Sequence, residues 1–264
     1  MGGELSQRLV PDDLWALVEP VLPSFRSRPQ GGGTAPVDQR AVFTAVVYVL
    51  TSGCAWRYVP PTFGVSPATA HRRFSFWTAS GVWRRLHRVV LDEIGARGGL
   101  DWSSVIVDAA SVRAKRGSLT GPNPVDRGKA GSKLHVLTDA QGLPVVVGVS
   151  AANVNDVQAL RPLILGIPAI RSRRGPRRRH PEKVRADKAY HSAGNLAWLR
   201  ERNITPRIAR PGVESPERLG RHRWNIERSI SWLFGYRRLT VRYERKGNHF
   251  LAFLGLAAAI ACYK

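Results

Sequence analysis

Apolar residues recur at helical spacing through the first part of the chain. A short helix begins near Asp12, and another begins behind Asp38, a good helix-capping residue. Val42, Val46 and Val49 then follow at four- and three-residue steps, which is typical of one buried helix face. A further helix is expected over residues 82–94, and the glycines of 95–99 mark a boundary. The pattern predicts a helical domain over residues 1–97.

Ser66 and Pro67 predict the start of another helix in this segment, because serine caps helices and proline suits the first helical position. Ala70, Phe74 and Trp77 then face inward. The residues left outward include candidate DNA contacts, namely Thr69, Arg72 and Arg73. The layout is helix-turn-helix-like, with a basic second helix of the kind that enters the major groove. A small helical domain with a solvated basic face is the alternative.

After residue 100 the pattern changes to short apolar runs. Strands are expected over residues 103–109, 133–138 and 145–150, with a hairpin turn at 139–142. Helices and strands then alternate: a helix over 155–163, a strand before Asp187, a helix over 192–202, a strand over 205–209, and helices from Ser215 and over 250–262. An antiparallel meander followed by helical crossovers predicts an α/β domain over residues 100–264, with a mixed sheet and helices on both faces.

Charge points to a polyanionic partner. Lys and Arg number 41 against 19 acidic residues, which gives a formal charge of +22. Basic side chains neutralise phosphates, so nucleic acid is the expected partner, although an ordinary basic surface is the alternative. Cys54 and Cys262 lack the spacing of a disulfide framework or a zinc site. The chain start does not match a signal peptide, and the apolar run 250–262 is too short to cross a bilayer. A cytoplasmic protein without membrane contact is expected.

Three acidic residues fit a metal site. Asp108 and Asp187 each end a strand-like run, and such strand ends can share one sheet edge. Glu227 lies at the margin of the buried stripe of a long helix. Hard divalent cations prefer carboxylate oxygens, so the three together favour metal-dependent chemistry. Taken singly, each has an ordinary structural explanation, such as an ion pair between Glu227 and Arg223.

Several strings along almost the whole chain resemble one family, the bacterial IS5 insertion-sequence transposases within the wider IS4-related DDE group. They are Val105–Asp108, Gly131–Asp139, Gly142–Pro144, Ala186–Tyr190, Arg223–Leu233, Tyr236–Leu239 and Arg242–Glu244. The resemblance implies an RNase H-like core with Asp108, Asp187 and Glu227 as catalytic, metal-binding residues. It implies two Mg²⁺ or Mn²⁺ ions acting in phosphoryl transfer.

The resemblance also implies partners and an activity. The protein would bind the terminal inverted repeats of an insertion sequence, cleave double-stranded DNA at its ends, and join the 3′-hydroxyl ends to target DNA. It would act as a homodimer or larger assembly on paired ends, beside the nucleoid in a bacterial cytoplasm.

The sequence departs from the family pattern around Glu227. Arg223 matches the signature and is a further candidate DNA contact, but Gly220 and Phe234 stand where the family has Tyr and Lys. The candidates to replace the missing Lys are Arg237, Arg238 and Arg242. Lys133 and Lys188 are candidate phosphate contacts, although each is equally explained as solvated. Tyr190 and Trp224 are expected to be packing residues rather than base-stacking ones.

Two other classes stay open. A metal-dependent endonuclease of the same fold would cut DNA without joining it. A catalytically inactive derivative would bind DNA without cutting it.

Overall fold

The computed structural model describes residues 2–24, 37–210 and 216–264, with side chains of 216–223 left out of the description. The helical first part holds α1 (Gly2–Leu9), α2 (Asp12–Val18), α3 (Gln39–Ser52), α4 (Pro67–Ala79) and α5 (Val82–Ala96). The strands are β1 (Val105–Ala114), β2 (Gly121–Pro122), β3 (Ala130–Asp139), β4 (Pro144–Ala151), β5 (Lys183–Ala186), β6 (Thr205–Ile208) and β7 (Val241–Arg242). The later helices are α6 (Val157–Leu165), α7 (Ala193–Arg200), α8 (Pro216–Phe234), α9 (Arg237–Thr240) and α10 (Gly247–Tyr263).

The helix starts of the first part follow local capping chemistry. The Asp38 carboxylate accepts hydrogen bonds from two backbone amides at the start of α3, both at 3.1 Å. The Ser66 hydroxyl accepts one from the amide of Thr69 at the start of α4. Both caps confirm the predicted helix starts. The connection between α3 and α4 runs over residues 53–66 and holds two 3₁₀ turns, so it is longer than the turn of a compact helix-turn-helix.

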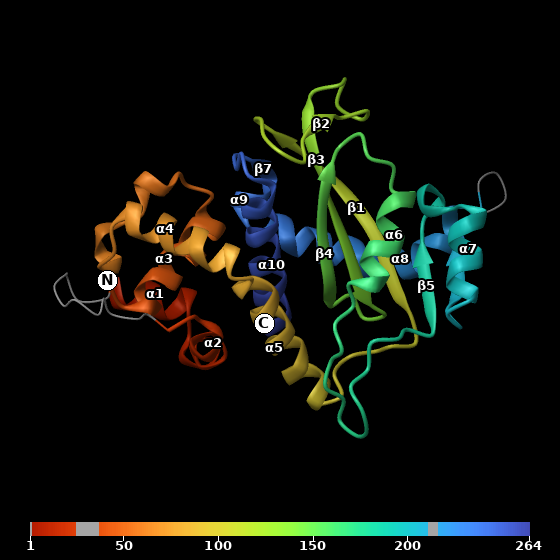
Figure 1. Ribbon diagram of the computed structural model, residues 1–264, viewed down its shortest axis with the longest axis horizontal. Helices are drawn as coiled ribbons and strands as arrows, with labels where there is room; N and C mark the ends of the chain where they lie inside the picture. Colours follow the sequence, from red (N-terminus) through yellow and green to blue (C-terminus); the bar gives the residue numbers. More distant parts are fainter. Residues whose placement is uncertain (1, 25–36, 211–215) are drawn as a thin grey trace.

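The sheet is mixed, as predicted. β3 pairs antiparallel with β4 on one side and with β1 on the other. β1 pairs in parallel with β5, and β5 with β6. β2 and β7 are short additions, β2 at the start of β3 and β7 at the end of β1 (Figure 1). The meander therefore supplies the antiparallel half, and the crossovers supply the parallel half.

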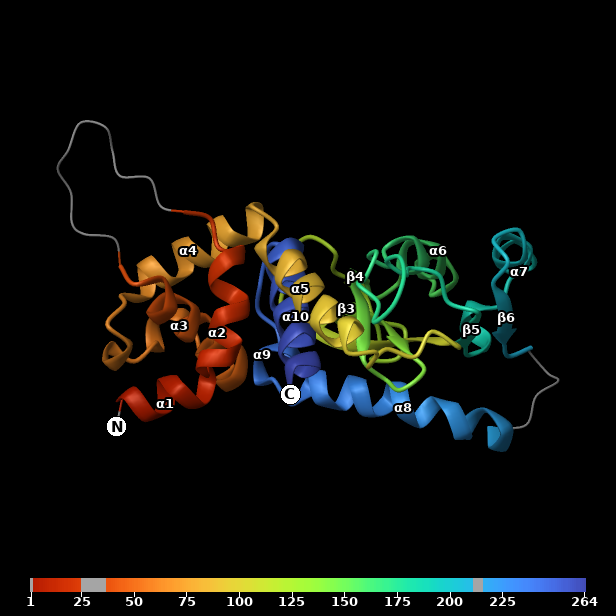
Figure 2. The same cartoon turned by 90° about the horizontal axis from the view of Figure 1, so that it is seen from below.

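Helices cover both faces of the sheet. α6 packs on β3 and β4, whereas α8 packs on β1 and β3 and runs beneath the sheet in Figure 2. α10 lies between the sheet and the helical first part, in contact with β4, α4 and α5 (Figure 1). The ring of Phe253 on α10 stacks on that of Phe74 on α4, with centroids 4.4 Å apart. One hydrophobic core therefore continues from the first helices into the sheet.

α10 is almost wholly buried, and it carries Cys262 into the core. Cys262 and the half-buried Cys54 are both free thiols, as their spacing predicted. Among the helices that the structure describes, none is long and apolar enough to cross a membrane.

A buried ion pair ties the end of the chain to its beginning. The Nε of Arg238 on α9 lies 2.6 Å from Oε1 of Glu244, and the two side chains are 7% and 5% exposed. Nη1 of Arg238 also donates to the carbonyl oxygen of Cys54 at 2.7 Å. A buried guanidinium needs such partners, because an unpaired charge in the core is strongly unfavourable.

We expect Arg238→Met to lower the free energy of unfolding by about 3–5 kcal/mol, since it leaves the Glu244 carboxylate buried without its partner. Urea unfolding measures the change. Arg237→Met, on the exposed neighbour, should change it by less than about 0.5 kcal/mol. A double variant that also carries Glu244→Met should recover much of the loss. Equal stability of Arg238→Met and Arg237→Met would contradict a stabilising role for the buried ion pair.

His87 links α5 to the β3–β4 hairpin. Its buried Nε2 donates to the carbonyl oxygen of Pro144 at 2.8 Å. Burial lowers the pKa of His87 to about 4, against a smaller raising effect of the Pro144 carbonyl. Burial likewise lowers the pKa of His135 to about 4.

This shift predicts a pH dependence of stability. Between pH 6.5 and 4, His87 binds a proton in the unfolded chain but stays neutral in the folded chain. The free energy of unfolding should therefore fall as pH falls through this window. The full effect of each histidine is about 3 kcal/mol. Urea unfolding at pH 7 and pH 4.5 should show a smaller pH effect in His87→Gln than in the wild type. An unchanged pH effect in the variant would show that His87 is not the group responsible.

Candidate catalytic carboxylate site

The register between β1 and β5 places two of the candidate acids side by side. Val107 on β1 pairs with Ala186, the last residue of β5. Asp108 and Asp187 are the next residues along these parallel neighbours, so they lie next to each other. This confirms the predicted shared edge.

One detail of the prediction is wrong, because Asp108 does not end its strand. β1 continues to Ala114, and it is β5 that stops. On the β5 side, β1 pairs with β5 as far as Val107 and with β7 from Arg113. Among the described strands none pairs with residues 108–112 on that side. The sheet therefore opens beside Asp108.

Backbone amides fix both aspartates locally. Oδ1 of Asp108 accepts a hydrogen bond from the amide of Ala109 at 2.8 Å. Oδ1 of Asp187 accepts one from the amide of Ala189 at 2.9 Å, at the start of the 3₁₀ turn Lys188–Tyr190. Both aspartates are half-buried, so their carboxylates sit at the boundary between the core and solvent.

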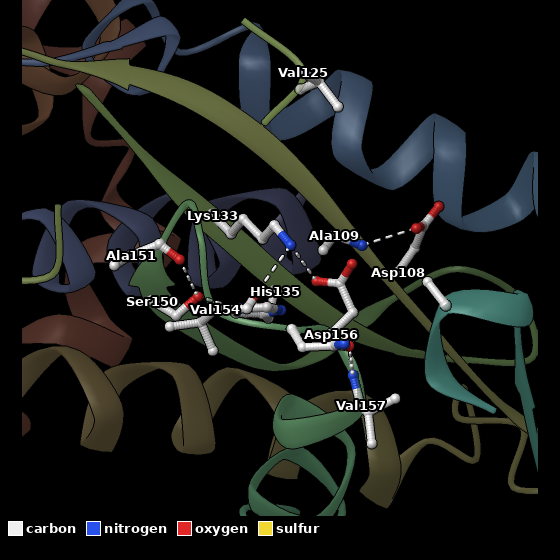
Figure 3. A network of polar contacts seen from close by, with 12 residues as sticks. Asp108, Ala109, Val125, Lys133, His135, Ser150, Ala151, Val154, Asp156 and Val157 are labelled. Carbon is white, nitrogen blue, oxygen red and sulfur yellow. Dashed lines mark hydrogen bonds and ion pairs between the residues drawn. The ribbon is translucent and has the colours of Figure 1, made fainter. Parts of the chain in front are cut away.

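Strand alternation decides which helix each side chain meets. Nζ of Lys133 on β3 lies 3.0 Å from Oδ1 of Asp156, the residue before α6, so Lys133 points to the α6 face (Figure 3). Lys133 pairs with Ser111 on β1, which shares that face. Asp108, three residues earlier on β1, points to the opposite face. That is the face on which α8 packs, and α8 carries Glu227.

The hairpin turn after β3 holds α8 in place. Nδ2 of Asn225 donates to the carbonyl oxygen of Ala140 at 2.8 Å, and the Ser229 hydroxyl donates to the carbonyl oxygen of Gly142. Gly142 has φ of +94°, and a Cβ there would lie 2.7 Å from the carbonyl oxygen of Asn225. Glycine therefore suits both the turn and the close approach. Glu227 lies on the α8 turn between these two contacts, with an exposed side chain.

Tyr190 connects the site to the core. Its side chain is 1% exposed, which confirms the predicted packing role. Its hydroxyl is buried and has no hydrogen-bond partner among the described residues. Burial raises the pKa of Tyr190, and the nearby charges of Asp156, Asp108 and Asp187 raise it further. The phenol therefore stays protonated beside three carboxylates.

The carboxylates fit a divalent cation in part. Asp108 and Asp187 offer adjacent hard oxygen donors, the type that Mg²⁺ and Mn²⁺ prefer. Glu227 lies on a helix over the same face. Among the side chains that the structure describes, however, no group of three or more His, Cys, Asp or Glu is gathered closely enough to hold one ion. The structure brings the two aspartates together and does not add the glutamate to them.

The candidate DNA contacts near the site differ in their environment. Lys188 and Arg237 are exposed. The Lys133 side chain is 14% exposed, and its ammonium donates to Asp156 and, at 2.9 Å, to the carbonyl oxygen of Val154. The side chain of Arg223 lies outside the described residues, as does Gly220.

Two of the arginines proposed to replace the family lysine are not available for DNA. Arg238 was expected to contact DNA, but it is buried in its ion pair with Glu244. Arg242 is fully buried, and Nη1 donates to the carbonyl oxygen of Leu119 at 2.9 Å and to the hydroxyl of Ser132 at 2.7 Å. Both expectations are wrong because backbone carbonyls and a carboxylate inside the fold claim these guanidinium groups.

The expected DNA contacts on α4 are partly exposed. Arg72 is exposed, whereas Thr69 and Arg73 are half-buried. Ala70, Phe74 and Trp77 are buried, which confirms the predicted inward face.

Sequence reasoning misplaced Trp224, which is 55% exposed on α8 and not a packing residue. Arg228, four residues later, was not singled out, and its guanidinium lies over the Trp224 ring, 4.6 Å from the centroid. Helical spacing of Trp224, Arg228 and Trp232 was the available signal.

Comparison with known proteins places these features in a family. Residues 103–262 match the family model described as "Transposase DDE domain", and residues 10–87 match the model of IS4/5-family transposases (DUF4096). A Burkholderia cepacia protein assigned as the transposase for insertion sequence element IS402 is 45% identical over 144 residues, which is 54% of this chain and 68% of that protein. The insertion element IS402 uncharacterized 16.2 kDa protein of Burkholderia cepacia is 38% identical over 42% of this chain and 76% of its own length.

Solved structures resemble the chain loosely. The piggyBac transposase synaptic complex with hairpin DNA matches with a TM-score of 0.40 and 10% identity, over 83% of this chain. The chain spans about half, 53%, of that piggyBac chain. The Mos1 transposase paired-end complex with left transposon end matches with a TM-score of 0.31 and 13% identity, over 91% of this chain and 84% of that one. On the two family models and the IS402 relatives, the chain belongs to the DDE transposases of the IS4/5 family.

Proposed function

We propose that Asp108, Asp187 and Glu227 are the catalytic carboxylates of this transposase, which cleaves DNA at the ends of an insertion sequence and joins the 3′-hydroxyl ends to target DNA. The observation that carries the assignment is the β1–β5 register, which sets Asp108 beside Asp187. Strand alternation supports Glu227, because α8 covers the face to which Asp108 points. The proposed cofactor is a pair of Mg²⁺ or Mn²⁺ ions held by these acids.

The roles of the side chains follow from charge and position. A bound divalent ion supplies Lewis-acid polarisation of the scissile phosphate. The three carboxylates would bind the divalent ions, because metal ligands bind in their deprotonated form. The Ala109 and Ala189 amides orient the two aspartates before any ligand arrives. Exposed Lys188 stands beside Asp187, where it is placed to receive a phosphate.

The helical segment, residues 1–97, is the proposed reader of the inverted repeats, and residues 100–264 the catalytic part. Exposed Arg72 on α4 is its proposed phosphate contact, with Thr69 and Arg73 beside it. The proposed assembly is at least a dimer on paired ends of double-stranded DNA. The proposed setting is a bacterial cytoplasm, next to the nucleoid.

We expect Asp108→Asn, Asp187→Asn and Glu227→Gln each to lower strand cleavage by at least about 1,000-fold, because each removes a charge that binds the ions. The assay contains Mg²⁺, labelled inverted-repeat DNA and a target plasmid, and gel shift on the same DNA should stay unchanged.

Two acids away from the candidate site, half-buried Asp126 and exposed Glu201, serve as matched controls for this assay. Asp126→Asn removes the surface ion pair with Arg113, and Glu201→Gln changes an exposed residue after α7; both should keep wild-type cleavage. Wild-type cleavage by any of the three site variants would refute the triad. Cut but unjoined product from the wild type would favour an endonuclease, and binding without cleavage an inactive derivative.

We expect Arg72→Ala to weaken duplex binding roughly equally across DNA sequences and to reduce the slope of log K against log salt by about 1, the effect of one lost phosphate contact. Fluorescence anisotropy over a salt series measures the slope. Arg97→Ala, at an exposed site after α5, is the control and should leave it unchanged. An unchanged slope in Arg72→Ala would refute the proposed phosphate contact of Arg72.

A further inference from the structure

Helix α8 carries two exposed tryptophans on one face. Trp224 is 55% exposed and Trp232 is 42% exposed. Arg228 lies midway between them in sequence, and its guanidinium carbon is 4.6 Å from the Trp224 ring centroid and 4.8 Å from the Trp232 centroid. We call these three residues the Trp–Arg–Trp stripe. Residues four apart share a helix face, so the stripe is continuous along two turns.

The cation at the centre of the stripe is held in place. Nη2 of Arg228 donates to the carbonyl oxygen of Gln141, in the hairpin turn that docks α8. The two rings and this carbonyl fix the guanidinium between them. A fixed cation between aromatic faces loses little side-chain freedom when a ligand binds, so the stripe is preorganised.

The stripe points away from the core. Ile226 and Leu233 on the same helix are buried, and α8 runs along the outside of the sheet in Figure 2. Glu227 lies between the buried side and the stripe, one residue from Arg228. At 1.5 Å per residue, the two tryptophans are separated by about 12 Å along the helix, with Glu227 between them.

We propose that the Trp–Arg–Trp stripe binds an unpaired DNA strand next to the cleavage site, with bases stacked on Trp224 and Trp232 and a phosphate near Arg228. The proposal rests on the proposed function for its location beside Glu227. Base stacking on exposed aromatic rings suits single strands of any sequence, because every base has a π face.

Charge favours nucleic acid over a protein partner. The chain carries a formal charge of +22, and the stripe places a cation between its two rings. A second copy of this chain would bring the same positive charge to the surface, whereas a DNA strand brings phosphates. The two ring centroids lie 4.6 and 4.8 Å from the same Arg228 guanidinium carbon, so a phosphate near Arg228 would lie between the two stacking surfaces.

The test measures binding without metal, so that no chemistry is involved. Fluorescence anisotropy compares a labelled 12-nucleotide oligothymidylate with a labelled 20-base-pair duplex. Trp224→Ala with Trp232→Ala should weaken oligothymidylate binding by at least about 10-fold and change duplex binding by less than about threefold. Trp224→Phe with Trp232→Phe should retain most of the affinity, because phenylalanine keeps a stacking face.

Trp198 on α7 supplies the matched control. It is half-buried, and Arg202 lies over its ring at 4.1 Å, so Trp198→Ala removes a similar cation–π pair elsewhere. Its binding of both DNAs should stay at the wild-type level. Thermal unfolding verifies that each variant is folded.

Three results would overturn the proposal: equal losses for both DNAs, no loss for the single strand, or a fall in molecular mass by light scattering, which would assign the stripe to contacts between copies. Asp108→Asn in the same metal-free assay should bind both DNAs like the wild type. Selective single-strand loss in the tryptophan variants supports the stripe even if the wild type does not cleave. If the wild type cleaves DNA but the tryptophan variants bind the single strand normally, the proposed role of the stripe is refuted and the catalytic assignment stands.

Discussion

The parallel pairing of β1 with β5 is the constraint on which the site depends. It lasts from Val105 to Val107 on β1, and β5 then ends. Over this stretch the β1 residues are apolar and buried, as in a sheet covered on both faces, whereas β5 alternates buried Val184 and Ala186 with half-buried Lys183 and Arg185. Where the pairing stops, no strand covers this side of β1 among the described residues. Asp108 and Asp187 are therefore only half-buried. The short β5 thus leaves room at the edge of a packed sheet for two adjacent aspartate side chains.

The hairpin turn after β3 fixes the position of α8 against the sheet. Asp139 is fully buried, and its carboxylate accepts hydrogen bonds from the amides of Gln141, Leu143 and Asp101 at 2.8–3.0 Å. Burial raises the pKa of Asp139, and these backbone hydrogen bonds oppose the rise. A turn held so firmly gives α8 a fixed docking point. The positions of Glu227 and of the exposed stripe therefore depend on the buried Asp139 carboxylate that holds this turn.

Sequence patterns predicted the elements well, because burial periodicity and caps are local properties. Asp38 and Ser66 mark their helices as expected, and the strand order follows from the alternation of runs. The expected strand stops at Ala109 because half-buried Asp108, Ala109 and Ala110 interrupt the apolar run, although the alternation of exposed and buried positions over 111–114 is itself a strand pattern. Tertiary contacts also determine which arginines are buried and which are exposed. Nothing local distinguishes buried Arg242 from exposed Arg237.

That difference changes how the positive charge should be interpreted. Arg238 and Arg242 spend their donors on Glu244, on the carbonyl oxygens of Cys54 and Leu119, and on Ser132. They join distant segments because a guanidinium has five donors in a rigid plane and can satisfy several acceptors at once. The formal charge therefore overstates the surface available to DNA. The cations that we propose for phosphate contacts belong to the exposed subset, namely Arg72, Lys188 and Arg237, and the surface that we propose for bases is the face of α8 with the exposed tryptophans.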